Sequence, residues 1–157
     1  MEKELNLTVN GKPYKIITKP TTLLVEVLRN ELGLTGTKMP CNSGSCGGCA
    51  VLVDGKVVKS CSLLALQVNG RNVLTIEGLA TGDKLHPIQQ SFIENHGFQC
   101  GYCTPGMIIS AKALLDENPN PTQQEVREFI SGKLCRCGTY PKIVKSILAA
   151  AKMMGGD

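Results

Sequence analysis

The first half of the chain alternates apolar and polar positions, which is the period-two pattern of β-strands. Leu5, Leu7 and Val9 alternate with polar residues, and Asn10-Gly11 then supplies a two-residue turn before the alternation resumes through residues 14–18. This pattern predicts a β-hairpin. A second turn signal at residues 54–55 separates two apolar runs, 50–53 and 56–59, and residues 73–76 read as a closing strand.

One helix is predicted within this half, after the first hairpin. Thr21 or Thr22 can cap it and Gly33 ends it, because a side-chain oxygen satisfies the first amide groups and glycine stops the helical pattern. Its apolar face has helical spacing and comprises Leu24, Val27, Leu28 and Leu32. A loop rich in glycine and cysteine follows at 35–49, so the first half is expected to be a small mixed sheet with one main helix, ending near Glu77.

The second half changes to a helical period after residues 78–85, whose turn composition predicts a linker. His86-Pro87 opens one helical segment and Thr104-Pro105 opens the next. After the break at 118–121, Thr122 and Glu125 have the spacing of a capping box, and a last amphipathic segment spans 141–151. We therefore predict an α+β protein with domains at residues 1–77 and 86–157, the second one made of four helices.

Composition is that of an ordinary globular protein, with 42% hydrophobic and 19% charged residues, which excludes a disordered or fibrous chain. No stretch approaches the roughly 18 apolar residues of a membrane span. The first four residues show no basic region before an apolar run, so we expect a cytoplasmic protein. Aromatic residues make up only 4%, which leaves few platforms for stacking nucleic-acid bases.

The eight cysteines change this picture, because a reducing compartment disfavours disulfides and leaves metal binding or redox chemistry as their use. The first set has the spacing C-x₄-C-x₂-C, with a fourth cysteine after eleven further residues; it comprises Cys41, Cys46, Cys49 and Cys61. That is the spacing of plant-type [2Fe–2S] ferredoxins. Structural zinc usually takes two short C-x₂-C elements, so the alternative of a zinc site or buried thiols fits this set poorly.

The second set consists of two close pairs thirty-one residues apart, Cys100 with Cys103 and Cys135 with Cys137. On spacing alone such a set could hold zinc equally well. Two features favour iron and sulfide: the neighbouring set already requires a cluster, and both pairs lie at predicted helix starts, where amide groups stabilise an anion. An oxidised [2Fe–2S] cluster on four thiolates carries about −2, so two clusters offset the formal charge of +4 and a nucleic-acid partner gains little support.

Three segments together resemble one family. They are Cys41 to Cys49 after Gly36-Thr37-Lys38, the run from Gln99 through Met107 (QCGYCTPGM), and Leu134-Cys135-Arg136-Cys137. The chain resembles the small iron–sulfur subunit of molybdenum hydroxylases, such as xanthine dehydrogenases, aldehyde oxidoreductases and carbon monoxide dehydrogenases, over nearly its whole length. It departs from the usual pattern at Pro40, at Gly48 and in the order Gly138-Thr139-Tyr140, and no departure removes a cysteine.

The resemblance implies an N-terminal ferredoxin-like β-grasp domain and a C-terminal four-helix bundle, each with one [2Fe–2S] cluster. It also implies a large molybdopterin-binding subunit and a medium FAD-binding subunit as partners, in a heterotrimer or a dimer of heterotrimers, with electrons passing from molybdopterin to FAD. In that family a glutamine at the position of Gln99 and a cysteine at that of Cys137 contact the pterin. The substrate pocket belongs to another subunit, so this chain is expected to have no catalytic residue.

Two alternatives remain at this point: a free-standing two-cluster electron carrier, and a zinc-stapled interaction module without redox activity. His86 and His96 lie beside predicted helix ends and are read as terminal residues, since eight thiolates complete two four-coordinate clusters. Arg136 either offsets cluster charge or points to solvent. No phosphate loop is present, because Gly101 to Gly106 lacks the Lys-Ser or Lys-Thr of a Walker motif.

Overall fold

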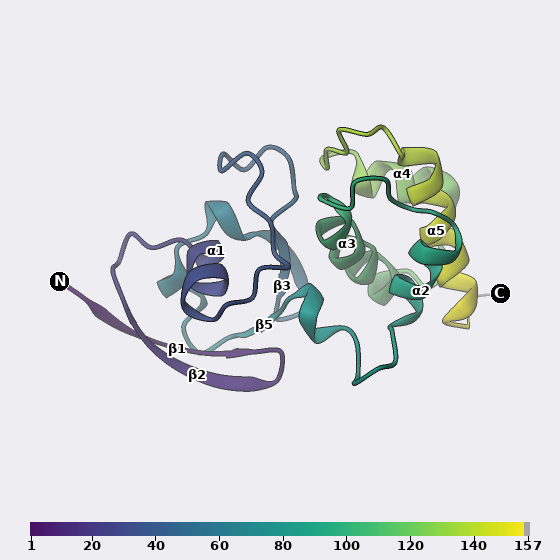
Figure 1. Ribbon diagram of the computed structural model, residues 1–157. Helices are drawn as coiled ribbons and strands as arrows, with labels where there is room; N and C mark the ends of the chain where they lie inside the picture. The colour runs from purple at the N-terminus through teal and green to yellow at the C-terminus, as the bar shows by residue number, and fades with distance from the viewer. Residues whose placement is uncertain (156–157) are drawn as a thin grey trace.

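The structure, a computed structural model, describes residues 1–155. Its first half is a five-stranded mixed sheet in the order β2-β1-β5-β3-β4. Strand β1 (Lys3–Val9) pairs antiparallel with β2 (Lys12–Thr18) and parallel with β5 (Asn72–Leu74). Strand β3 (Ala50–Val53) pairs antiparallel with both β4 (Lys56–Lys59) and β5. With the helices that follow (Figure 1), this sheet confirms the α+β class.

Both predicted hairpins form at their predicted turns. Asn10 and Gly11 have φ of 51° and 79°, and Asp54 and Gly55 have φ of 49° and 81°. Two successive positive φ angles define the tight turn whose twist matches that of paired strands, and Asn-Gly and Asp-Gly are the residues that adopt it most readily. Local turn chemistry therefore sets the register of both strand pairs.

The predicted helix is present as a short α1 (Leu24–Glu26) that widens into a π-helical segment, η1 (Val27–Glu31). Leu24, Val27 and Leu28 of its apolar face are buried as expected and Leu32 is partly buried, but the cap prediction was wrong. Leu23 is the N-cap residue, and its N–H donates to the Glu26 carboxylate at 2.7 Å. The backbone of Thr22 is occupied elsewhere: its N–H donates to Lys19 and its carbonyl accepts from Ala65.

Other boundaries of the first half differ from prediction because tertiary contacts intervene. Strand β5 ends at Leu74, since the Thr75 N–H donates to the Asn10 side chain at 2.9 Å, and the 3₁₀ turn η4 (Ile76–Gly78) follows. Two further 3₁₀ segments, η2 (Ser60–Ser62) and η3 (Ala65–Val68), were not predicted. The first of them carries Cys61 and so positions one of the candidate ligands.

The second half contains α2 (Pro87–Glu94), α3 (Thr104–Glu117), α4 (Gln123–Ile130) and α5 (Tyr140–Met153). His86 caps α2, with its Nδ1 accepting from the Ile88 N–H at 3.2 Å. The predicted capping box is confirmed at α4, where the Glu125 N–H donates to Thr122 Oγ1 and the Thr122 N–H donates to the Glu125 carboxylate. Within residues 1–155, no helix has the length and apolarity needed to cross a membrane.

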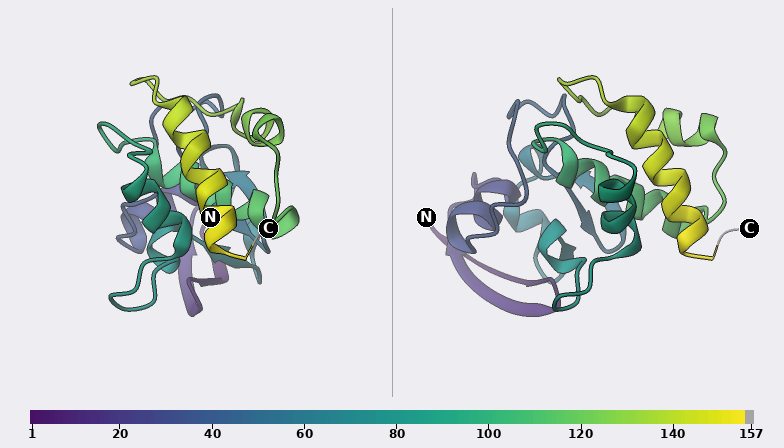
Figure 2. Two further views of the ribbon diagram at one scale, coloured as in Figure 1. Left: turned by 90° about the vertical axis from the view of Figure 1, so that its right-hand side faces the viewer. Right: turned by 45° about the vertical axis from the view of Figure 1, so that its right-hand side comes forward.

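Strand β3 joins the two halves because both of its faces are buried. Val51 and Val53 belong to the core that α1 closes over the sheet, whereas Ala50 and Leu52 pack into the core of the helical half. Alternate residues of a strand point to opposite faces, so one strand serves both cores. Figures 1 and 2 show α3 lying beside β3, with the loop before β3 and the loops around α3 on the same side of the molecule.

Candidate metal centres

The first cysteine set lies on the loop between η1 and β3 and on the η2 turn. Three residues of the loop have positive φ: Asn42 at 51°, Gly44 at 74° and Gly47 at 72°. This winding turns backbone amides toward Cys41, whose Sγ accepts from the N–H groups of Ser43 and Cys46, each at 3.4 Å. Concave runs of backbone amides of this kind favour an anionic group.

The side chain of Ser43, followed by the backbone N–H groups of Cys46 and Ser43, lowers the pKa of Cys41 to about 5. Cys41 is therefore a thiolate at neutral pH, which is the form that binds metal. Cys49 differs, because burial raises the pKa of its thiol to about 11. A metal centre at this site would thus bind one thiol that is already ionised and one that must release its proton.

Cys49 and Cys61 are neighbours, although twelve positions separate them in the sequence. The Ser60 hydroxyl donates to the Cys49 carbonyl at 2.7 Å and fixes the η2 turn against the end of the loop. The Cys61 thiol lies near enough to act on the pKa of Cys49. Cys46, Cys49 and Cys61 are buried, with at most 7% of their surface exposed, whereas Cys41 is half-buried.

The second set lies where α3 and α5 begin. Cys103 is the residue before α3, and Cys135 and Cys137 come shortly before α5. Cys137 lies near enough to act on the pKa of Cys100, and Cys135 lies near enough to act on the pKa of Cys103. The fold therefore brings together two pairs of cysteines that are more than thirty residues apart in the sequence.

The protonation of this set follows its surroundings. Burial raises the pKa of Cys103 to about 12. Burial also acts to raise the pKa of Cys135, but hydrogen bonds outweigh it and the net shift is downward, with the Thr139 hydroxyl 3.0 Å from its Sγ. The pKa of Cys100 is lowered, first by the backbone N–H of Tyr102. Each set thus holds at least one thiol with a lowered pKa beside one with a raised pKa.

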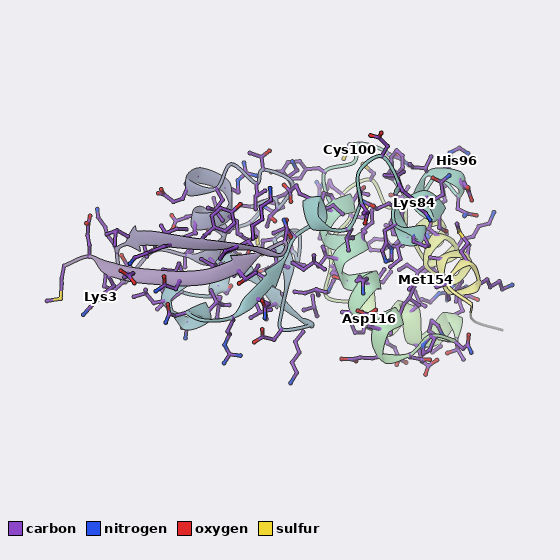
Figure 3. The ribbon with its side chains drawn as sticks, turned by 90° about the horizontal axis from the view of Figure 1, so that it is seen from below. Lys3, Lys84, His96, Cys100, Asp116 and Met154 are labelled. Atoms are coloured by element: carbon purple, nitrogen blue, oxygen red, sulfur yellow. The ribbon has the colours of Figure 1, made fainter. Side chains whose placement is uncertain are left out.

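The two sets differ in exposure. Cys100 and Cys137 are exposed, as is Gln99 beside them. Figure 3 shows Cys100 at the periphery of the helical half, whereas Lys3 and Met154 mark opposite ends of the molecule. The second set therefore opens to the surface, and three of the four thiols of the first set lie inside the protein.

The donors present suit a [2Fe–2S] cluster in each set, because thiolates are the ligands of such clusters and glycines stand where a larger residue would intrude. A Cβ on Gly44 would lie 2.6 Å from the Ser62 hydroxyl, so this turn has no room for a side chain. Near the second set, the hydroxyl oxygen of Thr104 is buried without a hydrogen-bond partner among the described residues. Among residues 1–155, no three His, Cys, Asp or Glu side chains meet at a point suited to a single metal ion.

The two sets are directly connected. The Leu134 N–H, next to Cys135, donates to the Cys46 carbonyl at 2.9 Å. Gly106 of α3 packs so tightly against the first loop that a Cβ there would lie 2.8 Å from the Gly47 carbonyl oxygen. Sequence reasoning did not find this contact, because it joins segments 60 to 90 residues apart and has no local signal.

The remaining predicted residues take the following places. Arg136 is exposed, and His96 lies past the end of α2 with a φ of 54°. Tyr140 has a role that the sequence did not reveal: its hydroxyl accepts from the Cys135 N–H at 2.8 Å and donates to the Lys133 carbonyl at 3.0 Å. It thereby holds the segment that carries the C-x-C pair.

Comparison with known proteins agrees with two centres. Residues 7–74 match the family described as "2Fe-2S iron-sulfur cluster binding domain", and residues 75–148 match "[2Fe-2S] binding domain". The chain is 43% identical to a probable xanthine dehydrogenase subunit from Bacillus subtilis, covering 99% of this chain and 89% of that one. It is 45% identical to the nicotinate dehydrogenase small FeS subunit of Eubacterium barkeri, covering 94% of each.

Among solved structures, a chain of quinoline 2-oxidoreductase from Pseudomonas putida 86 superimposes with a TM-score of 0.94 at 43% identity, and 99% of each chain is covered. The fold and the cysteine sets thus define an iron–sulfur protein of the [2Fe–2S] class that transfers electrons. More particularly, the chain belongs to the family of small iron–sulfur subunits of molybdenum hydroxylases, and it is a non-catalytic subunit of an oxidoreductase.

Proposed function

We propose that the eight cysteines bind two [2Fe–2S] clusters, one on Cys41, Cys46, Cys49 and Cys61 and the other on Cys100, Cys103, Cys135 and Cys137. The observation that supports this proposal is that thiols from separate chain segments lie near one another: Cys61 acts on Cys49, Cys137 on Cys100 and Cys135 on Cys103. The Cys46 N–H also donates to the Cys41 Sγ. When bound, each cluster accepts and passes on one electron at a time. The chain's own residues hold the thiols, shield the first set from water and leave the second set open.

We further propose two domains, residues 1–77 and 86–157, with 78–85 as the linker. The five-stranded sheet with α1 on one face supports a ferredoxin-like β-grasp for the first domain. The four helices α2 to α5 around one apolar core support a four-helix bundle for the second. The Thr81 and Lys84 backbones bond to each other, so the proposed linker makes a tight turn of its own.

The exposure of the second set supports a direction for the electrons. We propose that Cys137 and Gln99 contact a molybdopterin on a large subunit, since both side chains lie at the surface beside Cys100. Electrons then pass to the first set and leave toward FAD on a medium subunit, in a heterotrimer or a dimer of heterotrimers. The hydrogen bond from Leu134 to the Cys46 carbonyl offers a short through-bond link between the two sets.

The experiment compares variants of two proposed cysteine ligands with a control variant of a neighbouring serine. Cys46→Ser should remove only the signal of the first cluster in the EPR spectrum of the reduced protein, and Cys103→Ser only that of the second, because each set has its own four thiols. Ser45→Ala, an exposed neighbour of Cys46, should retain both signals. If either cysteine variant lost both clusters while staying folded, the division into two independent centres would be wrong.

A further inference from the structure

Lys133 is close in sequence to Cys135 of the second set, but its side chain packs on the loop of the first set. A Cβ built on Gly47 would be 2.8 Å from the Lys133 Cγ, so the aliphatic part of this lysine covers the first loop at Gly47. The adjoining Leu134 N–H bonds to the Cys46 carbonyl, and the Tyr140 hydroxyl holds the Lys133 carbonyl. The peptide group that follows the lysine is therefore fixed between the first cysteine loop and α5.

The charge of this lysine is not offset by a carboxylate. The three ion pairs among the described residues involve other lysines and arginines. The Lys133 Nζ lies 5.7 Å from the centre of the Phe129 ring, and the charged groups that act on it are Lys59 and the Cys49 thiol of the first set. Lys59 itself donates from its Nζ to the Gly44 carbonyl at 2.6 Å. Two cations thus flank the loop that holds Cys41, Cys46 and Cys49.

We propose that Lys133, together with Lys59, raises the reduction potential of the first centre relative to the second. This inference rests on the proposed binding of a [2Fe–2S] cluster by each set. A cluster on four thiolates carries about −2 when oxidised and about −3 after gaining one electron. A nearby positive charge stabilises the more negative state more strongly. The lysines therefore favour transfer of one electron to the first centre. The second centre supplies this electron and is oxidised by one electron.

Position explains why the effect falls on one centre. The side chain of Lys133 packs on Gly47, between Cys46 and Cys49 of the first set, and the Cys49 thiol is among the charged groups that act on it. It is half-buried, so water and salt screen its charge only in part. Removing the charge should shift the distribution of the electron between the two centres about tenfold toward the second, which corresponds to about 59 mV for a one-electron couple.

The test is a redox titration of the purified holoprotein followed by EPR, which separates the two cluster signals. Lys133→Met removes the charge and keeps an unbranched side chain on Gly47, whereas Lys133→Arg keeps the charge. Lys59→Met tests the second cation. Lys152→Met, in the last turn of α5, removes one positive charge far from the first loop and is the matched control.

The expected result is a lower potential of the first cluster in Lys133→Met and in Lys59→Met, with little change in Lys133→Arg and Lys152→Met. The proposal is overturned if Lys133→Met leaves the first potential unchanged, shifts both potentials equally, or shifts it no more than Lys152→Met does. Iron and sulfide analysis of the same samples tests the binding of the clusters separately from the role of Lys133. Absence of clusters from the wild-type protein would refute the proposed function, whereas intact clusters with unchanged potentials would refute only the role of Lys133.

Discussion

Gly106→Ala is expected to destabilise the protein through a contact between the two cysteine-bearing segments. The added Cβ would lie 2.8 Å from the Gly47 carbonyl oxygen and 3.1 Å from both the Cα and the carbonyl oxygen of Gly48. All three atoms are backbone, so neither side can yield by a change of rotamer. The start of α3 and the first cysteine loop must therefore move apart.

The magnitude follows from two opposing effects. Overpacking of this kind costs about 1–3 kcal/mol. Alanine is favoured over glycine inside a helix by about 1 kcal/mol, and this gain is smaller in the first turn, where Gly106 lies. The net loss in the free energy of unfolding is about 1–2 kcal/mol. For a chain of this length that corresponds to a fall in melting temperature of about 2–8 °C.

The assay is thermal unfolding of the protein as isolated, followed by far-ultraviolet circular dichroism. Gly132→Ala is the matched control, because no atom lies within 4 Å of its added Cβ, and its stability should stay within about 0.5 kcal/mol of wild type. If Gly106→Ala melted at or above the wild-type temperature, the close contact between α3 and the first loop would not exist in solution.

Three further changes test other parts of the account. Gln99→Ala should leave both clusters assembled and reducible by dithionite. It should slow their reduction by substrate in the assembled enzyme about two- to tenfold, since a hydrogen bond of about 0.5–1.5 kcal/mol is lost. A wild-type rate in rapid-mixing absorbance measurements would show that the Gln99 side chain does not contribute to this reduction. Thr122→Ala should cost about 1 kcal/mol in urea unfolding, because the Glu125 N–H loses its acceptor, and Thr122→Ser should restore most of it. In the cluster-free protein at pH 7, iodoacetamide should label Cys41 well before Cys103, because their pKa values of about 5 and about 12 leave only the first thiol ionised. The labelling of Cys41 should slow as the pH falls through about 5. Equal labelling rates of the two cysteines, measured by peptide mass spectrometry, would contradict these pKa shifts.

Much of the fold could be predicted because its signals are local. Asn10-Gly11 and Asp54-Gly55 specify turns that need no distant contact, and the spacing of Thr122 and Glu125 specifies a helix start. The predictions failed where a distant group decides the outcome. Leu23 replaces the threonines as the cap of α1 because the chain there also pairs with the segment around Leu64 and Ala65.

In the candidate site, too, the features with local signals could be predicted and those that depend on distant contacts could not. The spacing of the cysteines predicted two groups of four, because loop ligands lie close together in the sequence. The position of Lys133 on Gly47 could not be predicted, since its nearest cysteine in the sequence, Cys135, belongs to the other set. The support that Tyr140 gives to the Cys135 segment depends on how α5 turns back over that segment, which no local pattern encodes.

The measurement that tests the central claim most directly is the metal and sulfide content of the purified chain, combined with EPR after reduction. Two [2Fe–2S] clusters on eight thiolates predict about four iron and four acid-labile sulfide per chain, visible absorbance, and two distinct paramagnetic signals. Stoichiometric zinc without visible absorbance or labile sulfide would contradict the account.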